Sequence, residues 1–296
     1  MNIVKYSKFY FIFSGLLILT SVIFLFAWGF KLGVDFTGGS LLELKFIQKE
    51  PKISELRKEI NSVLGTDFTL QESGEKGIIL RAKNITEEEH QEIIDTLGGK
   101  DEVIEERFEM VGSVVGKELR RSTMIALILA LFFITIYVAS AFRKVSKPIP
   151  SWQYAIAALI ALFHDILITC GAFALFGKFL GIEVNIPFVA ALLTILGYSI
   201  NDTIVIFDRL REHIVREDET FGNIVNISIK ETFARSLFTS ITTLLPLFAI
   251  LFFGGETLFP FVLALIIGIF FGTYSSIFIA PPVLYSWIRL KEKRSS

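Results

Sequence analysis

Six long apolar segments constrain this chain more than any other feature of its sequence. Most have about the 20 residues that an α-helix needs to cross the hydrocarbon core of a bilayer. They cover residues 9–30, 122–142, 156–176, 186–207, 238–253 and 258–280. The fifth is short unless it begins near Arg235, and the sixth is expected to run on past Pro281 and Pro282. Because the chain is also 52% hydrophobic, we predict a multi-pass membrane protein.

Lysine and arginine in the short loops set the predicted orientation. The cations that share one side are Lys5, Lys8, Arg143, Lys144, Lys147, Arg209, Arg211, Arg216, Arg289, Lys291, Lys293 and Arg294. The loops on the opposite side, at 177–183 and 254–257, hold a single lysine. Both termini are therefore predicted to be cytoplasmic. The first segment is too long for a typical cleaved signal peptide, so we expect it to stay as a membrane helix.

Residues 31–121 separate the first two spans and are predicted to form a folded domain outside the cytoplasm. Alternating patterns predict strands at 40–47, 67–73, 77–83 and 102–111, and amphipathic patterns predict helices at 51–65 and 86–99. Gly74-Glu75-Lys76 is a hairpin signal, and Thr86 is a helix N-cap. The order βαββαβ predicts a small ferredoxin-like α+β domain.

The predicted fold is thus an all-α bundle of six transmembrane helices with an inserted α+β extracytoplasmic domain. Its parts are the first transmembrane helix at 1–30, the extracytoplasmic (periplasmic) domain at 31–121 and a five-helix transmembrane bundle at 122–296. A cytoplasmic connector at about 209–235 reads as one or two helices. Its apolar residues Phe221, Ile224, Ile227 and Ile229 either lie on the membrane surface or belong to a plain connector helix.

Asp202, in "LGYSINDTIVIFDRLRE" (196–212), is the main candidate for a functional residue. It lies five residues, or about 8 Å, inside the apolar stretch, and a short aspartate cannot snorkel that far. A charge in such a place costs up to roughly 3 kcal/mol, so it predicts a site on an ion or proton pathway. Tyr198, Ser199 and Asn201 are its polar neighbours. The alternative is a polar group that only bonds a neighbouring helix.

A possible partner for Asp202 lies in the fifth segment, "ARSLFTSITTLLP" (234–246). The residues on one helical face are Arg235, Thr239, Thr242, Thr243 and Pro246. This hydroxyl stripe below a cation can hold water, and Arg235 can pair with ionised Asp202. The alternative is that Arg235 anchors the helix in the cytoplasm and the hydroxyls bond their own helix.

The third segment contains His164 and Asp165 near mid-membrane. Adjacent residues on a helix point about 100° apart, so we expect only one of the two to face a water-filled seam. Asp165 and Asp202 also raise the possibility of an aspartyl intramembrane protease. Such enzymes need a close dyad and carry a Gly-x-Gly-Asp signature, which is absent here. We therefore predict no enzymatic activity.

Other features narrow the function further. "GVDFTGGS" (33–40) is typical of a turn into a strand. Gly268, Gly272 and Ser276 form a small-residue face for close helix packing, as do Ala157 and Ala161. The three histidines lack metal-ligand spacing, the single cysteine excludes an internal disulfide, and a net charge of −1 argues against a nucleic-acid partner.

Together these motifs resemble the SecF branch of the SecD/SecF family of bacterial protein-export membrane proteins, in the resistance-nodulation-division superfamily. The resemblance rests on "GVDFTGG", the "HD" of the third segment, "GYSINDTIVIFDRLRE" and "RSLFTSITTLLP". It covers nearly the whole chain. It implies a multi-pass protein of the cytoplasmic (inner) membrane that pairs with SecD in a twelve-helix assembly. The implied complex assists translocation of a polypeptide through the SecYEG channel, and its partners extend to YajC, YidC and membrane lipid.

The resemblance also implies site residues and an energy source. It places Asp202 and Arg235 in an ion pathway, and we add Asn201, Thr239, Thr243 and Asp165. The signature turn residues are Gly33, Asp35, Gly38 and Gly39. The transported ion is H⁺ or Na⁺, with no cofactor or metal. The alternative function is a resistance-nodulation-division half-transporter that exports a small molecule or lipid, and a third is a non-conducting assembly factor.

Overall fold

The computed structural model describes residues 2–47, 52–65, 67–73, 76–143, 149–216, 219–255 and 258–295. Within these residues six helical stretches are long and apolar enough to cross a membrane, which confirms the predicted class of fold. The chain divides into two units: Met1–Lys31 with Ile125–Ser296, and Leu32–Met124. The predicted turn at Gly74 and Glu75 and the loop cations Lys144 and Lys147 lie outside the described residues.

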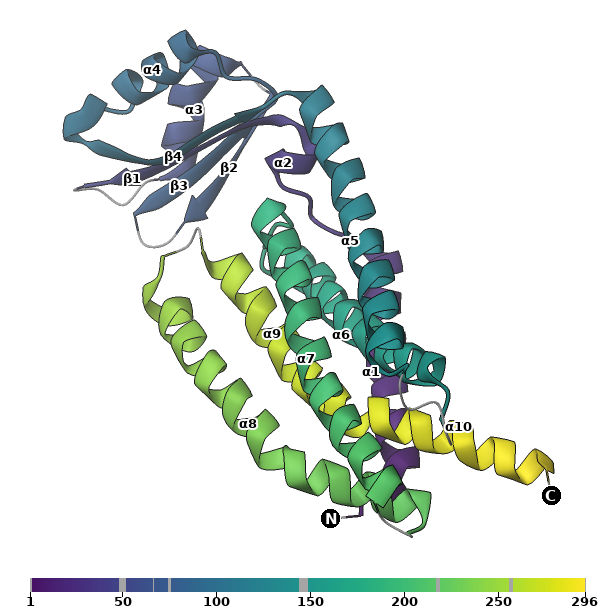
Figure 1. Cartoon of the computed structure of the whole chain (residues 1–296). Helices are drawn as coiled ribbons and strands as arrows, with labels where there is room; N and C mark the ends of the chain where they lie inside the picture. Colours follow the sequence, from purple (N-terminus) through teal and green to yellow (C-terminus); the bar gives the residue numbers. More distant parts are fainter. Residues whose placement is uncertain are drawn as a thin grey trace. The chain divides into compact units, whose positions relative to one another are not determined.

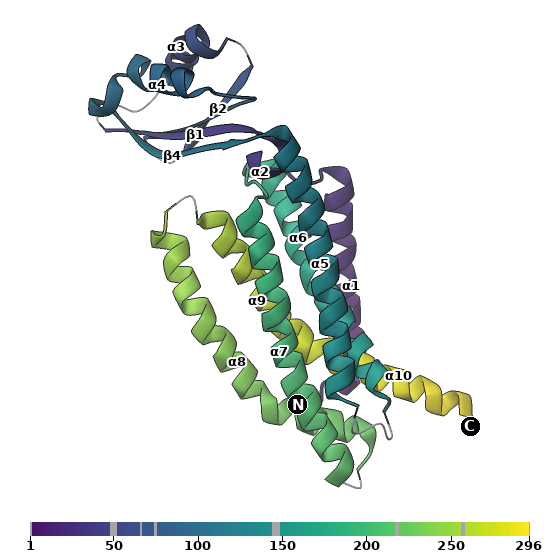
Figure 2. The same ribbon diagram turned by 45° about the horizontal axis from the view of Figure 1, so that its top comes forward.

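The first unit is a helical bundle (Figures 1 and 2). Its helices are α1 (Ser7–Ala27), the membrane part of α5 (Ser113–Ala141), α6 (Ser151–Phe179), α7 (Ile186–Arg216), α8 (Phe221–Phe253), α9 (Phe259–Phe278) and α10 (Ala280–Ser295), with a 3-10 turn at Val4–Tyr6 before α1. Helices α6, α7 and α9 pack against one another, α1 lies against α6, and α8 lies against α7 and α9. The side chains of α6, α7 and α9 are mostly buried by this chain itself, whereas α1, α5 and α8 leave most of their apolar surface open.

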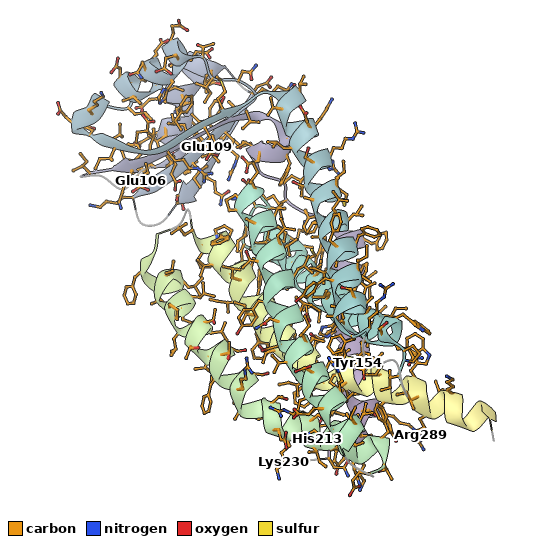
Figure 3. The ribbon with its side chains drawn as sticks, in the orientation of Figure 1. Glu106, Glu109, Tyr154, His213, Lys230 and Arg289 are labelled. Atoms are coloured by element: carbon orange, nitrogen blue, oxygen red, sulfur yellow. The ribbon has the colours of Figure 1, made fainter. Side chains whose placement is uncertain are left out.

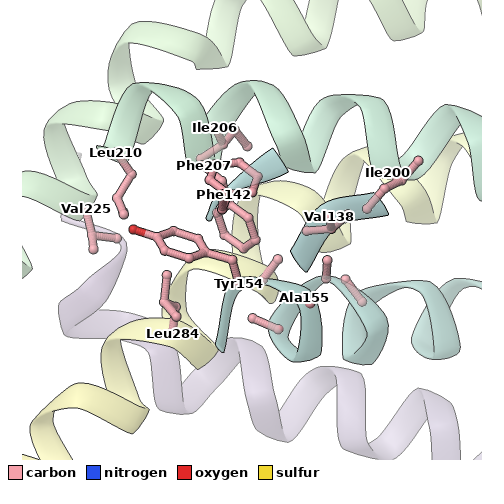
Figure 4. Close-up of a cluster of buried hydrophobic side chains, with 14 of the residues drawn as sticks. Val138, Phe142, Tyr154, Ala155, Ile200, Ile206, Phe207, Leu210, Val225 and Leu284 are labelled. Atoms are coloured by element: carbon pink, nitrogen blue, oxygen red, sulfur yellow. The ribbon is translucent and has the colours of Figure 1, made fainter. Parts of the chain in front are cut away.

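A buried cluster of aromatic and aliphatic side chains forms the core of the bundle at one of its ends (Figure 4). The Tyr154 ring lies 4.8 Å from that of Phe142 and 5.3 Å from that of Phe207, centroid to centroid. Leu210, Val225 and the aliphatic residues around them are fully buried beside it. The cluster joins α5, α6, α7, α8 and α10, so it fixes their relative positions at this end.

Two local features go beyond what the sequence predicted. The apolar helical stretch of the sixth span runs on past Pro281 and Pro282 to Lys291, as expected, but it contains a break: α9 ends at Phe278, and α10 begins at Ala280 in another direction (Figures 1 and 2). Pro281 and Pro282 fall in the first turn of the new helix, where proline is tolerated because its missing N–H has no partner there. For Ile224 and Ile229 the sequence left open a membrane-surface position or a plain connector helix, and the structure shows neither residue on an exposed surface. They are buried in the bundle core, because α8 begins at Phe221 and continues into the fifth span.

The second unit is a four-stranded antiparallel sheet with two helices on one face (Figure 2). Its elements are α2 (Val34–Thr37), β1 (Gly39–Phe46), α3 (Ile53–Leu64), β2 (Phe68–Ser73), β3 (Gly77–Ala82), α4 (Glu87–Thr96), a 3-10 turn (Gly99–Asp101) and β4 (Val103–Val111). The strand order β2-β3-β1-β4 is that of the predicted ferredoxin-like fold. Helix α4 begins with a capping box, in which the Thr86 hydroxyl and the Glu89 carboxylate satisfy each other's backbone N–H groups.

Candidate functional site

Asp202 is only 5% exposed and lies on the face of α7 that is turned to α8. The α8 groups that act on its carboxylate are the Ser236 hydroxyl and the Arg235 guanidinium. Within the described part of the chain, however, Asp202 Oδ2 and Ser236 Oγ are each buried without a hydrogen-bond partner of normal geometry. An unpartnered buried carboxylate oxygen is costly, so this arrangement is typical of a functional position rather than of a packing contact.

The sequence left two roles open for Arg235, an ion pair with Asp202 or an anchor at the helix end. Its side chain is exposed in this chain, and it forms no ion pair with Asp202 within 4.0 Å among the described residues. It acts on Asp202 through the longer-range Coulomb interaction. Asn201 is exposed as well. The structure therefore places Asp202 just inside the bundle, with Asn201 and Arg235 at the open side of the same α7–α8 seam.

The predicted hydroxyl stripe faces away from the bundle interior. Thr239 and Thr242 are exposed. Thr239 Oγ1 donates to the Arg235 carbonyl at 2.8 Å, and Thr243 Oγ1 donates to the Thr239 carbonyl at 2.9 Å. These are the helix's own carbonyls, which is the alternative that the sequence left open.

A second hydroxyl stripe, not identified from the sequence, occupies the buried face of α8. Its members are Ser228, Thr232, Ser236 and Ser240. Their spacing of four residues places them on one helical face, although the spacing does not show that this face is the buried one. Ser240 Oγ accepts from Tyr198 Oη of α7 at 3.2 Å and shares a 2.5 Å hydrogen bond with Thr273 Oγ1 of α9. This stripe thus carries polar contacts from the Asp202 site to Thr273 along the seam of three helices.

His164 and Asp165 form the centre of a separate buried network. His164 Nδ1 lies 2.9 Å from Asp165 Oδ1, and His164 Nε2 lies 3.2 Å from Ser14 Oγ of α1. Asp165 Oδ2 accepts hydrogen bonds from Ser199 of α7 at 2.6 Å and from Ser275 of α9 at 2.9 Å. The fully buried Asp165 carboxyl group therefore joins α6, α7 and α9, and His164 extends the network to α1.

This geometry joins His164 and Asp165 directly, while their other contacts go to different helices: His164 to Ser14 of α1, and Asp165 to Ser199 and Ser275. The two Cβ atoms do diverge, but the long imidazole reaches back to the carboxyl group. It also gives no support to a protease dyad. Ser199, one turn before Asp202, donates to Asp165, and the two carboxyl groups make no hydrogen bond to each other among the described contacts. We therefore distinguish a satisfied network at Asp165 from an unsatisfied site at Asp202.

The small-residue face of α9 packs inside the bundle. A Cβ on Gly268 would collide with the Ile195 side chain, and one on Gly272 would lie 3.0 Å from Ser199 Cβ. This close approach joins α9 to α7, and Ser199 of α7 and Ser275 of α9 both donate to Asp165 of α6.

The glycines of the signature turn, residues 33–39, are required by the local backbone geometry. Gly33 precedes α2, and its carbonyl accepts from the backbone N–H groups of Phe36 and Thr37, while Asp35 is buried. Gly38 has φ +75°, and a Cβ there would lie 2.6 Å from Ser113 Cα. Gly39 has φ +127°, and its Cβ would lie 2.8 Å from the Ala82 carbonyl oxygen. Only glycine suits both the backbone angles and these approaches of β3 and α5.

The described residues give no support to a metal site or to a cysteine with a functional thiol. No group of three His, Cys, Asp or Glu side chains there is arranged to hold a metal ion. Cys170 is a single thiol within α6.

Comparison with known proteins gives two family matches. Residues 92–290 match the family model described as protein export membrane protein SecD/SecF, C-terminal. Residues 23–48 match the model of the SecD/SecF GG motif, which covers the glycine turn.

Full-length relatives give the same result. The chain is 39% identical to protein translocase subunit SecF of Thermobaculum terrenum, covering 97% of this chain and 94% of that protein. It is 40% identical to protein translocase subunit SecF of Sebaldella termitidis, covering 99% of this chain and 93% of that one. Among solved structures, SecDF of Thermus thermophilus superposes with a TM-score of 0.83 at 33% identity. That match covers 98% of this chain but only 39% of the longer SecDF chain.

Proposed function

The chain belongs to the SecD/SecF family of protein-export membrane proteins, and on this premise we propose that it is the SecF-type subunit of a complex that assists Sec-dependent protein translocation. The supporting observation is the match of nearly the whole chain to SecF proteins at about two fifths identity. Those relatives are translocase subunits, so the alternative of an exporter of small molecules or lipids is not favoured. The complex lies in the bacterial inner membrane with both chain termini in the cytoplasm, and the subunit is a transporter component rather than an enzyme.

SecD is the proposed partner at the open side of the α7–α8 seam. Asn201, Arg235 and Thr239 are exposed on membrane-crossing helices of this chain. Polar and charged side chains on a lipid-facing helix surface carry a free-energy cost, so such a face calls for a protein cover. Gly197 lies one turn before Asn201, and a Cβ there would meet nothing within 4 Å in this chain, so the surface also leaves room for a close helix. The longer SecDF chains, of which this one spans about two fifths, have the additional length to provide that cover.

Asp202 is the proposed ion carrier. It accepts a proton, or in some members a sodium ion, from the outer side and releases it to the cytoplasm. Its unpartnered Oδ2 gives the ion a place to bind, and the Ser236–Ser240–Tyr198 hydroxyls give a polar route along the seam. Neutralising Asp202 weakens its attraction to Arg235, so the two states favour different packings of α7 and α8.

The energy available is adequate for such a shift. A membrane potential of 100 mV supplies about 2.3 kcal/mol for each elementary charge that crosses. The outer domain is joined to the bundle through α1 and α5 and is proposed to hold and release the emerging polypeptide as the bundle changes. SecYEG provides the channel, and YajC and YidC are the further proposed partners.

The test uses the complex with SecD in proteoliposomes that contain the channel and a preprotein. We expect Asp202→Asn to abolish gradient-stimulated translocation while ATP-driven translocation remains. Asp208→Asn is the matched control, because Asp208 lies on the same helix but is exposed. Intact stimulation in Asp202→Asn would contradict the ion-carrier role. Failure of the chain to copurify with SecD, or its isolation as a homo-oligomer, would contradict the SecF-type assignment itself.

A further inference from the structure

An apolar groove lies between the cytoplasmic ends of α1 and α10, remote from the Asp202 site. It has a volume of about 410 Å³ and is lined by Phe11, Val283, Ser286, Trp287 and Leu290. Ser286 is the single polar residue in this lining. We propose that the groove binds one acyl chain of an anionic phospholipid of the inner leaflet, with the phosphate held by Lys8 and Arg289.

The direction of α10 makes this groove part of the membrane interface. Helix α10 takes a different direction from α9, directly after the break at Ile279 (Figures 1 and 2). One of its sides is tied to the bundle, where Leu284 is fully buried and Ile288 packs on the core. The adjacent side, with Val283, Trp287 and Leu290, faces the groove. A helix with an apolar side and a basic end that lies across the bundle axis is typical of an interfacial helix.

Gly15 extends the open path along α1. It lies one turn beyond Phe11 towards the membrane centre, and a Cβ on it would meet nothing within 4 Å. Gly171, Gly268 and Gly272, in contrast, sit at tight helix crossings. Gly15 therefore serves no close helix packing within this chain. Its missing side chain leaves a smooth strip of α1 surface that continues the groove in the direction an acyl chain would take.

The charges around the groove match an anionic headgroup. Lys8 is exposed one turn before Phe11, and Arg289 is exposed next to Leu290. Figure 3 shows Arg289 at the same end of the bundle as His213 and Lys230, the end to which the loop cations assign the cytoplasm. Cations at this level attract the anionic lipids of the cytoplasmic leaflet. The Trp287 ring lies 4.9 Å from that of Trp152, centroid to centroid. Tryptophan is enriched at the membrane–water interface, where lipid headgroups lie.

These observations favour a lipid over a protein helix as the occupant. The lining is apolar apart from Ser286, and the neighbouring cations Lys8 and Arg289 lie outside it. Lipid binding here does not depend on whether Asp202 carries an ion, so the two proposals can fail separately.

Trp287 itself provides the reporter for a test. The chain has three tryptophans, so Trp28→Phe with Trp152→Phe leaves Trp287 as its only one. The full chain is reconstituted into nanodiscs of phosphatidylcholine with rising fractions of dibrominated phosphatidylglycerol or, in parallel, dibrominated phosphatidylcholine. We expect bromine to quench Trp287 at a several-fold lower fraction of phosphatidylglycerol than of phosphatidylcholine.

Two variants separate the parts of the site. Lys8→Gln with Arg289→Gln is expected to remove the preference for phosphatidylglycerol, whereas Lys230→Gln, which changes a cation on α8, is expected to keep it. Gly15→Leu is expected to weaken quenching by both lipids because it fills the acyl path, and Gly15→Ala serves as its mild control. Equal quenching by the two lipids in the parent chain, or no quenching because a protein segment covers Trp287, would overturn the proposal.

Discussion

The two buried carboxyl groups of the bundle differ in how their oxygen atoms are satisfied. Both Asp165 oxygens have partners, from His164 on one side and from Ser199 and Ser275 on the other. Asp202 Oδ2 has none among the described residues. A satisfied network stabilises one arrangement of helices, while an unsatisfied oxygen leaves binding capacity. This difference, rather than depth in the membrane, separates a structural aspartate from a candidate ion carrier.

The difference predicts unequal costs for two buried serines. Ser199→Ala removes a hydroxyl that donates to Asp165, so we expect the free energy of unfolding to fall by roughly 1–3 kcal/mol. Ser236→Ala removes a hydroxyl without a hydrogen-bond partner of normal geometry, so we expect a change below about 0.5 kcal/mol. Denaturation of the purified chain in mixed micelles with increasing SDS measures both. Equal losses in the two variants would show that the Asp165 network does not stabilise the bundle.

Sequence reasoning at this scale found the polar residues but not their contacts. Asp202 is identifiable because a carboxylate in an apolar run is rare. On α8, however, Arg235-Thr239-Thr243 and Ser228-Thr232-Ser236-Ser240 have the same four-residue period, so the sequence cannot say which of the two faces is buried. The choice depends on tertiary packing. The hydrogen bond between His164 and Asp165 likewise depends on tertiary structure. The orientation of the imidazole is set partly by Ser14, which belongs to a distant part of the sequence.

At the scale of helices, α1 attaches to α6 through small residues. The buried residues of α1 are Ser7, Ser14 and Ser21, which repeat every seven positions. Gly171 of α6 lies against Ser21 so closely that a Cβ would stand 2.5 Å from Ser21 Cα. Small residues at such spacing let two membrane helices approach until their backbones are nearly in contact. The hydrogen bond between His164 and Ser14 relies on this approach.

The crossing predicts opposite effects for two glycine substitutions. Gly171→Ala forces α1 away from α6, and we expect it to lower the free energy of unfolding by about 1–3 kcal/mol, as overpacking does. Gly15→Ala meets open space and adds helix propensity, so we expect it to be neutral or to stabilise by up to about 1 kcal/mol. The SDS denaturation above measures both variants. A destabilising Gly15→Ala would mean that a neighbour occupies the space beside this residue.

The helices and strands themselves were largely predictable. The six apolar runs and the alternating patterns of the outer domain have strong periods, and the structure confirms the class of fold. Continuity was not predictable. The break at Ile279 and the unbroken passage of α8 from the predicted connector into the fifth span depend on what each turn packs against. The hydropathy of a helical turn shows whether its residues are apolar, but it does not show whether the helix continues through that turn.

At the scale of the whole molecule, this chain buries some of its helices and leaves others open. Helices α6, α7 and α9 bury each other, while α5 and α8 expose much of their length in this chain. On α8 and the adjoining face of α7 the exposed surface includes polar side chains, which lipid covers poorly. The bundle therefore has the character of one half of a larger assembly, as its coverage of two fifths of SecDF also suggests.

A labelling experiment tests this expectation. In a Cys170→Ser background, Asn201→Cys places a thiol at the open seam. We expect N-ethylmaleimide to modify it in the chain alone and to modify it at least tenfold more slowly in the complex with SecD. Leu16→Cys, on the lipid side of α1, is the control and is expected to react equally in both samples. Equal rates at Asn201→Cys would mean that SecD covers a different face.

The turn between α9 and α10 has a mechanical consequence. In the interfacial position that we propose for α10, the sixth span continues into a segment that lies along the leaflet surface. This segment would resist vertical displacement, because a piston stroke would drag it into the acyl layer or lift it into water. The sixth span is thereby held at constant depth. Any working stroke in this subunit must then come from tilting or rolling of the less enclosed fifth span against a stationary neighbour.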